Sequence, residues 1–409
     1  MNRWNNFKIS HLKDILKDVK SYNFENYLCN FIKLNNNILQ KCVEIRRDRF
    51  NIKNIPYKNY NYLKNLNKNC ENVVGYVRIP IGMIGPIEIN NDKKFIPFAT
   101  TEGALVSSIN RGCKLLCLSK NEIIVEDIGM TRSPIIKCKT LTELVNIKLW
   151  INENFKHIKN EFEKDSNFAI LKNIDFLQEG RHLHLRFCAT TGEAMGMNMV
   201  SKSTDNVLKF LNKKFDIEIV SLSGNTCTDK KASAINLIKG RGKHVVMESL
   251  IKKYDLFKIL KVTPDEMINL NIQKNLIGSS LVATIGGNNC NASNIVSGLF
   301  IATGQDCGQI GTSSYCIINM TKENEDLLVS INMPALELAT IGGGTSLEDQ
   351  INNLKIIHSN KKFDVKYLAK NIIYSVLACE LSLMSALCND DLVKAHLKLN
   401  RGLNIEKYN

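Results

Sequence analysis

Three charged residues stand side by side in the segment SGNTCTDKKAS, residues 223–233: Asp229, Lys230 and Lys231. Adjacent ammonium groups repel each other and add nothing to an apolar core. A glycine and an asparagine just upstream favour a bend in the chain. The segment is therefore either a solvated turn or a loop that directs its charges at an anionic partner, and the rest of the sequence has to decide between the two.

The overall charge is compatible with an anionic partner but does not require one. The chain has 54 Lys+Arg against 40 Asp+Glu, a formal charge of +14. Such an excess suits nucleic acid, a membrane surface or a phosphate-bearing small molecule. Many of the lysines, however, lie in Asn/Lys/Ile-rich stretches such as KLNNNILQK, which are typical of solvated surfaces. With 409 residues and 44% apolar residues, the chain is long enough for two or three globular domains.

The 13 cysteines favour reduced thiols over a zinc site or a disulfide framework. They are scattered and include no CxxC pair, and Cys113 and Cys117, the closest approach to a metal spacing, have no histidine nearby. The amino-terminal stretch MNRWNNFKISHLKD is too polar for a signal peptide. The most apolar run, IIYSVLACELSLMSALC, carries Glu380 in its middle and predicts a buried helix. We therefore expect a soluble, cytoplasmic protein with no bound metal and no membrane segment.

Apolar spacing predicts helices over residues 1–69 and short strands with tight turns over 73–90. Residues 100–119 then predict a helix capped by one of the two threonines that open it. Residues 134–221 predict a compact β-α-β-α-β module. Its expected strands are 134–140, 181–190 and 216–223, and its expected helices are 142–165 and 198–215.

Glycines cluster in short polar segments such as TGEAMGMN and TIGGGTS. No GxGxxG or GxxxxGK[ST] pattern follows a predicted strand, so neither a standard Rossmann fingerprint nor a P-loop is present. So many glycine turns still indicate places where the backbone approaches a ligand closely.

Taken together, the motifs resemble the class I hydroxymethylglutaryl-CoA reductase family. The resemblance runs from about residue 25 to 405, in one order. The segments that carry it are ENVVGYVRIPIGMIGP (71–86), TTEGALVSSINRGCK (100–114), GMTRSP (129–134), TGEAMGMNMVSK (191–202), SGNTCTDKKASAINLIKGRGK (223–243), NIQKNLIGSS (271–280), IGGNNCNASNIVSGLFIATGQD (285–306), MPALELATIGGGT (333–345) and ELSLMSALCNDDLVKAHLKLNR (380–401).

The resemblance implies an α+β fold and a reductase of the mevalonate pathway of isoprenoid biosynthesis. The expected reaction converts (S)-hydroxymethylglutaryl-CoA to (R)-mevalonate and CoA at the expense of two NADPH. The implied domains are a helical amino-terminal domain (1–69), a large substrate- and CoA-binding domain (70–133 and 222–409) and an inserted small nicotinamide-binding domain (134–221). The small domain would be ferredoxin-like rather than a Rossmann fold.

The family's catalytic residues match four positions, and each suits the chemistry. Hydride attack on a thioester builds charge on its oxygen, which the Lys230 ammonium would stabilise. His396 would protonate the departing CoA thiolate. Glu102 would give a proton to the alkoxide of the second reduction, for which it must itself stay protonated. Asp306 is the expected neighbour of Glu102 and the expected bridge to Lys230.

Binding residues are carried over by the same matching. The free carboxylate of the substrate is expected to meet Arg132, Ser223, Asp229, Lys231, Lys274 and Asn294. CoA is expected to meet Ser108, Asn110, Arg111 and Lys261, with Tyr57 or its neighbour Tyr60 over the adenine. The coenzyme is expected to meet Ser166, Asn167, Phe168, Glu193, Met195, Gly196, Met197, Asn198, Gly342 and Gly343.

Three positions depart from the family pattern. Asn291 stands where the family has a histidine, Gly402 stands where some relatives have a regulatory serine, and Asn167 replaces an arginine. Because asparagine cannot form the charged fork that arginine makes with a phosphate, we expect a reduced preference for NADPH over NADH unless Lys172 compensates.

The segment 71–75, ENVVG, matches the family's dimer motif, and we expect a homodimer or homotetramer. The alternative from another class is a non-enzymatic basic binding protein that keeps the fold. Against it, the whole catalytic set is present, and no zinc, RRM or basic-aromatic signature indicates nucleic-acid binding.

Overall fold

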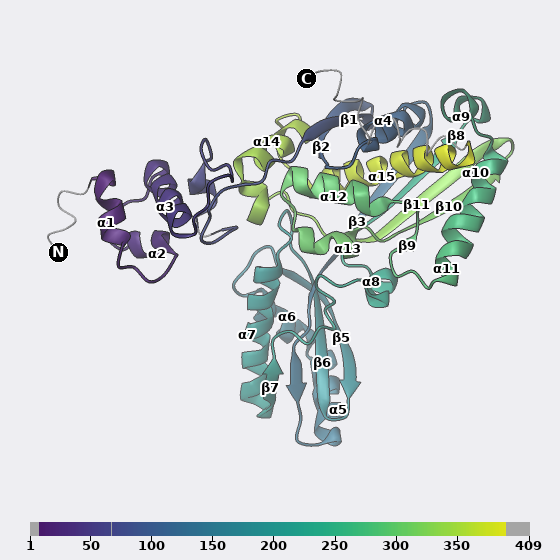
Figure 1. The fold of residues 1–409 in the computed structure, drawn as a ribbon. Coiled ribbons are helices and arrows are strands. Elements are labelled where there is room, and N and C mark those ends of the chain that lie inside the picture. Colours follow the sequence, from purple (N-terminus) through teal and green to yellow (C-terminus); the bar gives the residue numbers. More distant parts are fainter. Residues whose placement is uncertain (1–7, 67, 390–409) are drawn as a thin grey trace.

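The structure is a computed structural model that describes residues 8–66 and 68–389 of the 409-residue chain (Figure 1). Helices and strands are mixed along the chain in an α+β arrangement. One sheet of nine strands runs through the molecule in the order β7-β4-β6-β3-β8-β11-β10-β9, with β5 paired to β6. All neighbours in this sheet are antiparallel except β9 and β10. Its strands are β3 (Lys120–Arg132), β4 (Ile135–Lys137), β5 (Ile170–Glu179), β6 (His182–Thr190), β7 (Glu218–Ser221), β8 (Gly242–Ile251), β9 (Gly287–Asn288), β10 (Cys316–Glu323) and β11 (Asp326–Leu336).

Strand β3 joins the two halves of this sheet. Its residues 120–129 pair with β8, and its last three residues pair with β6. The changeover falls at Gly129, whose φ is +107°. A Cβ there would lie 2.7 Å from the carbonyl oxygen of Ala189, so the position needs glycine. One continuous strand therefore carries the chain from the upper body of Figure 1 into the lower one.

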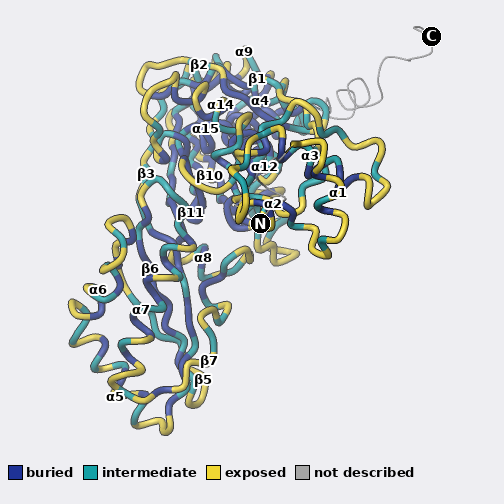
Figure 2. Tube along the Cα trace, turned by 90° about the vertical axis from the view of Figure 1, so that its left-hand side faces the viewer, coloured by how far each residue is buried: buried dark blue, intermediate teal, exposed yellow. Residues whose placement is uncertain are grey.

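Helix α15 (Val365–Cys388) lies at the centre of the larger half, between the sheet and the helices α4 (Leu105–Leu116) and α12 (Ala292–Thr303) (Figure 1). It is long and apolar enough to cross a membrane, but 78% of its most apolar stretch is buried inside the fold. Buried positions follow it and the sheet beside it (Figure 2). The prediction of a buried helix around Glu380 is confirmed, because Glu380 is 0% exposed.

Helices α4 and α15 approach closely at a glycine. A Cβ on Gly112 would lie 1.8 Å from the carbonyl oxygen of Ala378, far inside van der Waals contact. The hairpin of β1 (Ile81–Ile89) and β2 (Asp92–Ala99) packs beside α4, α12 and α14 (Glu348–Ile357). These contacts close one continuous apolar core around α15.

Residues 134–221 form a smaller half with its own apolar core, in which Phe162 stacks on Phe187 at 5.8 Å. The predicted β-α-β-α-β order is wrong by one strand. The observed order is β4, α5 (Leu141–Glu153) with α6 (Phe155–Glu163), β5, β6, α7 (Met197–Phe215) and β7. Strand β5 was missed because it lies at the sheet edge and its five apolar and five polar residues do not alternate cleanly.

The expected helices of the amino-terminal region are present but short: α1 (Leu12–Leu16), α2 (Phe24–Leu28) and α3 (Asn36–Arg49). Two neighbouring buried arginines of α3 hold the segment 71–75. Arg46 makes a double contact with the Glu25 carboxylate at 2.6 and 2.7 Å and donates to the Val73 carbonyl. Arg47 donates to the Val74 carbonyl at 2.7 Å. The region is thereby joined to the chain that leads into β1.

The predicted threonine cap of α4 is wrong. The helix begins at Leu105 after Ala104, which has φ +71° and provides no side-chain cap. The Thr100 hydroxyl instead accepts the Glu102 amide at 3.0 Å, in the turn that follows β2. The remaining elements are α8 (Ala234–Lys239), α9 (Lys253–Leu260), α10 (Pro264–Leu270), the π-helix η3 (Asn271–Gly278), α11 (Ser279–Leu281), α13 (Ile310–Ser313) and the 3-10 turns η1 (Ile9–His11), η2 (Tyr62–Lys64), η4 (Cys307–Gln309) and η5 (Gly343–Ser346).

Replacing Gly112 by alanine tests the contact between α4 and α15. The added methyl would force the two backbones apart, and we expect a loss of stability of about 1–3 kcal/mol or more. Thermal unfolding followed by circular dichroism measures it. The matched control is Gly311→Ala, because nothing lies within 4 Å of a Cβ at Gly311. Equal melting temperatures for Gly112→Ala and the control would contradict this packing.

Candidate functional site

The segment 223–233, between β7 and α8, is a strained loop. Asn225, Thr228 and Lys230 have φ values of 63°, 56° and 58°, a region that non-glycine residues rarely adopt. Tertiary contacts hold it there: the Thr131 hydroxyl donates to the Cys227 carbonyl at 2.7 Å, and Thr228 donates to the Asn236 side chain. The loop is therefore a fixed element and not a solvated turn.

Lys230 points its ammonium at a carboxylate. Its Nζ lies 2.9 Å from Oδ2 of Asp306, the contact expected between these two residues. Asp306 is held in turn, because its Oδ1 accepts the Gly308 amide at 2.9 Å. The hydrogen bond that Lys230 donates to the Asp306 carboxylate raises the pKa of Lys230 above its ordinary value. The ammonium therefore stays charged at neutral pH, and the side chain remains half-exposed.

Gln309, a residue that sequence reasoning missed, forms hydrogen bonds with both Asp229 and Lys230. Gln309, fully buried, donates through Nε2 to Asp229 at 2.7 Å and accepts the backbone amide of Lys230 at 3.2 Å. Burial alone would raise the pKa of Asp229, but the Gln309 hydrogen bond and the charges of Arg241 and Arg132 hold it below its usual range. One amide side chain thus fixes both charged residues of the loop.

Arg241 is the second missed residue, and it lies under the loop with 0% exposure. Its guanidinium donates to the Thr131 hydroxyl at 2.8 Å, to Asp229 at 3.2 Å and to the Met197 sulfur at 3.1 Å. It also pairs with the buried Glu337 carboxylate at 2.5 Å. Burial raises the pKa of Glu337 and the guanidinium opposes that rise. In the sequence, Arg241 stands between two glycines, and this pattern does not indicate a buried side chain.

A cavity of about 770 Å³ opens beside Lys230 and Asp306. At Gly196, φ is +82° and a Cβ would lie 2.3 Å from the Thr191 methyl carbon. At Gly342 and Gly343, φ is also positive and no atom lies within 4 Å of a Cβ position, so this backbone is open to a ligand. The cavity lies among the loop 194–199, Arg132, Asp229, the segment 304–307 and the glycine turn 341–345.

Of the expected coenzyme residues, six line this cavity: Met195, Gly196, Met197, Asn198, Gly342 and Gly343. The other four do not. Ser166, Asn167 and Phe168 form the turn between α6 and β5, where Phe168 is 65% exposed. Glu193 uses its carboxylate inside the protein, accepting the Thr340 hydroxyl at 2.5 Å and the Val365 amide at 2.8 Å.

Of the expected carboxylate-binding residues, Arg132 lies at this cavity and donates to Ser223 at 3.1 Å and to Ser201 at 3.0 Å. Lys231 is exposed, and its Nζ reaches only the Asp229 carbonyl, at 3.4 Å. The two adjacent lysines of the loop therefore have different environments: Lys230 pairs with Asp306, and Lys231 faces outward.

Three further expected residues, Glu102, Lys274 and Asn294, belong to a second group around the start of α12 and the middle of α15. Here the fully buried Glu380 accepts the amides of Cys290 at 2.8 Å and Asn291 at 2.7 Å. Burial raises the pKa of Glu380, while those amides and the charge of Lys274 oppose the rise. Burial raises the pKa of the neighbouring Cys379 to about 11, and the charge of Glu102 adds to it.

Asn291, the family departure, lies in this second group. Its Nδ2 donates to the Cys379 sulfur at 3.4 Å, and its buried Oδ1 has no hydrogen-bond partner within residues 8–66 and 68–389. Asn294, half-buried, follows on α12. Within the described part of one chain, no hydrogen bond or ion pair joins Glu102 or Lys274 to Lys230 or Asp306. The expected contact of Glu102 with Asp306 is therefore absent from a single described chain.

The expected CoA residues are spread over several elements. Ser108 donates to Ser382 at 3.0 Å, and Arg111 donates to Ser382 and Ser385 at 3.0 and 3.2 Å. Asn110 accepts the Gly85 amide at 2.7 Å. Lys261 ends α9. Tyr57 lies under the Arg47 guanidinium, 4.3 Å away, in the wall of a separate 430 Å³ cavity. His396 lies outside the described residues.

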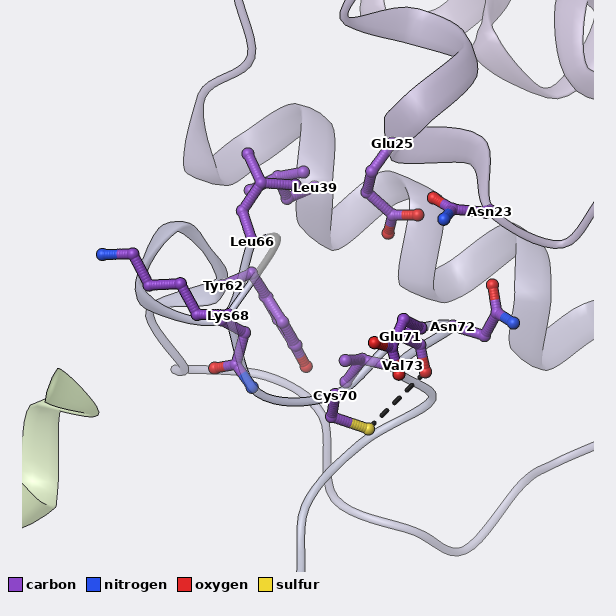
Figure 3. Close-up of a pocket in the computed structure, with 11 residues that line it drawn as sticks. Asn23, Glu25, Leu39, Tyr62, Leu66, Lys68, Cys70, Glu71, Asn72 and Val73 are labelled. Carbon is purple, nitrogen blue, oxygen red and sulfur yellow. Dashed lines mark hydrogen bonds between the residues drawn. The ribbon is translucent and has the colours of Figure 1, made fainter. Parts of the chain in front are cut away.

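A further small cavity lies at the segment 71–75 and is lined by Glu25, Tyr62, Glu71 and Val73 among others (Figure 3). Its volume of about 40 Å³ has room for water but not for a coenzyme. Among the residues that the structure describes, no group of three or more His, Cys, Asp or Glu is arranged to hold a metal. All 13 cysteines are free thiols.

The fold resembles solved structures of Streptococcus pneumoniae 3-hydroxy-3-methylglutaryl-coenzyme A reductase. One matches with a TM-score of 0.64 and 14% identity, over 94% of this chain and 98% of that one. Another, a class II enzyme described as bound to NADPH in open conformations, matches with a TM-score of 0.64 and 15% identity, over 78% of each chain. At this identity the likeness concerns the fold alone.

Sequence relatives are closer. The 3-hydroxy-3-methylglutaryl-coenzyme A reductase of Agrotis ipsilon is 48% identical over 361 residues, 86% of this chain and 43% of that relative. The corresponding enzyme 1 of Hevea brasiliensis is 43% identical over 87% of this chain and 64% of its own length. This chain thus spans less than two thirds of these relatives. The family model of hydroxymethylglutaryl-coenzyme A reductase matches residues 35–401, and the chain belongs to that family.

Proposed function

We propose that the chain reduces the thioester of (S)-hydroxymethylglutaryl-CoA to (R)-mevalonate and releases CoA, as its family membership suggests. The observation that carries this proposal is the Lys230–Asp306 pair at the wall of a large cavity lined by glycine turns. No observation favours the alternative of a non-enzymatic basic binding protein.

Lys230 is proposed to stabilise the negative charge that develops on the carbonyl oxygen in both reductions. Its fixed left-handed backbone and its contact with Asp306 hold the ammonium in place before substrate arrives. The raised pKa keeps that ammonium charged. Arg132 and Ser223, joined at 3.1 Å, are proposed to bind the free carboxylate of the substrate, with Lys231 closing on it from outside. His396 is proposed to protonate the departing thiolate.

The coenzyme is proposed to be NADPH, which would supply the hydride when bound. The cavity fits it in two ways: open glycine backbone at 342–343, and a helix start at Met197, where a glycine with φ +82° lets the chain turn into α7. The β-α-β-β-α-β order of residues 134–221 supports a ferredoxin-like coenzyme domain without a Rossmann fingerprint.

We also propose the domain limits 1–69, 70–133 with 222–409, and 134–221. They are supported by separate apolar clusters: one around α15, one in residues 130–217 and two smaller ones in the amino-terminal helices.

The two separate groups of expected site residues support a site shared between subunits. Lys230 and Asp306 belong to one group, and Glu102 and Lys274 to the other. In a twofold dimer, the first group of one subunit can meet the second group of its partner. The segment 71–75 is the proposed dimer contact, and the buried arginines of α3 fix its backbone.

A complementation experiment tests the shared site. Lys230→Ala and Glu102→Gln should each be inactive as homodimers. Co-expressed with different tags and purified as a mixed dimer, they should regain activity, because one of the two sites then has both native residues. NADPH oxidation that depends on the thioester measures this. An inactive mixed dimer, or a fully active monomer in sedimentation, would contradict the proposal.

The two half-reactions separate the roles of Lys230 and His396. His396→Gln should slow thioester reduction about 10²–10⁴-fold, the usual contribution of a general acid, and leave reduction of added mevaldehyde largely intact. Lys230→Ala should slow both, because both develop charge on the same oxygen. Each variant is assayed with the thioester and with mevaldehyde. If His396→Gln abolished mevaldehyde reduction as fully as Lys230→Ala, the division of roles would be wrong.

Gln309→Leu tests positioning of the loop. Leucine keeps the volume but loses both hydrogen bonds, so the Lys230 ammonium should lose its fixed position. We expect kcat to fall about 10–100-fold in both half-reactions, with a smaller change in KM. The matched control is Gln178→Leu, on the exposed end of β5. Circular dichroism must show both variants folded. An unchanged kcat in a folded Gln309→Leu protein would refute the positioning role.

A further inference from the structure

A second, smaller cavity lies where the two halves of the sheet meet. Its volume is about 260 Å³. Lys172, which the sequence suggested as a substitute for the missing coenzyme arginine, lines this cavity, whereas the residues proposed to bind the coenzyme line the larger one. Three parts of the fold contribute to the smaller cavity. They are the outer face of β5 and β6, the end of β3, and the junction between α8 and β8. Its wall includes Lys172, Arg186 and Lys239, together with Ile128, Cys188 and Gly240.

Arg186 is the central residue of this wall. It is 2% exposed and points away from the apolar core of the small half, because its neighbours Leu185 and Phe187 on β6 take that face. Its Nη1 donates to Asp175 at 3.1 Å. Its Nε and Nη2 are buried and have no hydrogen-bond partner among the residues that the structure describes. A buried guanidinium with two unpaired nitrogens is an unusual and costly arrangement.

The charges around the cavity do not balance. Asp175, the acceptor for Arg186, is shared with Lys239, whose Nζ lies 2.6 Å away. Lys172 donates to the carbonyl of Asp127 at 2.5 Å, and the carboxylate of Asp127 is taken by Lys243 at 2.7 Å. Two of the three cations, Arg186 and Lys239, therefore share the Asp175 carboxylate, while Lys172 donates to a backbone carbonyl. Arg186 is the most buried of the three.

We propose that this cavity is a binding site for a phosphate-class oxyanion, separate from the coenzyme and substrate sites. An oxyanion would accept hydrogen bonds from the unpaired guanidinium nitrogens of Arg186. Its negative charge would also balance the positive charges of the two lysines. The site connects β5 and β6 to α8, and α8 directly follows the Lys230 loop. Occupation would tie the small half of the molecule to the end of that loop.

The source of the oxyanion can be inorganic phosphate or the phosphate of a small ester, and the experiment separates them. The full chain is saturated with CoA and NADP⁺, so that phosphate sites of the proposed reaction are filled. Inorganic phosphate or glycerol phosphate is then titrated at constant ionic strength, with chloride as the reference salt. Isothermal titration and the melting temperature report binding. We expect a saturable isotherm with one site per chain and a rise in melting temperature that chloride does not give.

Lys172→Gln/Lys239→Gln should weaken this binding at least about tenfold, because both charges are lost. The control is Lys148→Gln/Lys156→Gln, which removes the same net charge from α5 and α6 and should bind like the unaltered chain. Arg186→Leu should also lose binding, and the lysine pair decides if that variant does not fold. No saturable binding by the unaltered chain, or equal affinities of the two lysine variants, would overturn the proposal. So would a loss of NADP⁺ affinity in Lys172→Gln/Lys239→Gln that matched its loss of phosphate affinity, since the cavity would then belong to the coenzyme site.

Discussion

A buried guanidinium that cannot lose its charge must be surrounded by acceptors, and Arg241 imposes this constraint on the centre of the molecule. It satisfies the constraint with Glu337 directly after β11, Asp229 of the Lys230 loop and Thr131 at the end of β3, and it contacts Met197 at the start of α7. These four residues come from four separate stretches of chain. One charge thus holds them together, and two of them, Asp229 and Met197, line the cavity beside Lys230.

The loop that carries Lys230 can keep an unfavourable backbone because of this support. Three non-glycine residues with positive φ each cost of order 1–3 kcal/mol, and a free loop would relax. Gln309 binds the Asp229 side chain and the Lys230 amide at once, so relaxation of either residue would break a buried hydrogen bond. The strain therefore has a consequence for chemistry: the ammonium reaches Asp306 from a backbone that cannot swing away.

Sequence reasoning found the features that form a recognisable pattern of neighbouring residues along the chain. The adjacent lysines, the glycine turns and the apolar run around Glu380 all have one, and their positions in the fold agree with it. It missed β5, because the apolar and polar residues of this edge strand do not alternate, and it misplaced the cap of α4, because Thr100 is used in a turn. It also missed Arg241, Gln309 and Glu337. Their importance lies in burial and in contacts between distant segments, and no spacing along the chain expresses either.

The second group of expected site residues is also organised around a buried ionisable group that needs hydrogen-bond partners, but here the group is a carboxylate and its partners are donors. Glu380 is a buried carboxylate, and it is satisfied by two backbone amides at the start of α12, where the helix dipole favours negative charge. Asn291 provides no cap for α12, so this carboxylate from α15 takes the place of one. Each group is thus built around one buried charge and is rigid by itself. No described contact in a single chain joins Glu102 to Lys230, so in the proposed dimer the geometry between the two groups would be set by assembly. A shared site would then couple activity to the oligomer, without any moving part inside either group.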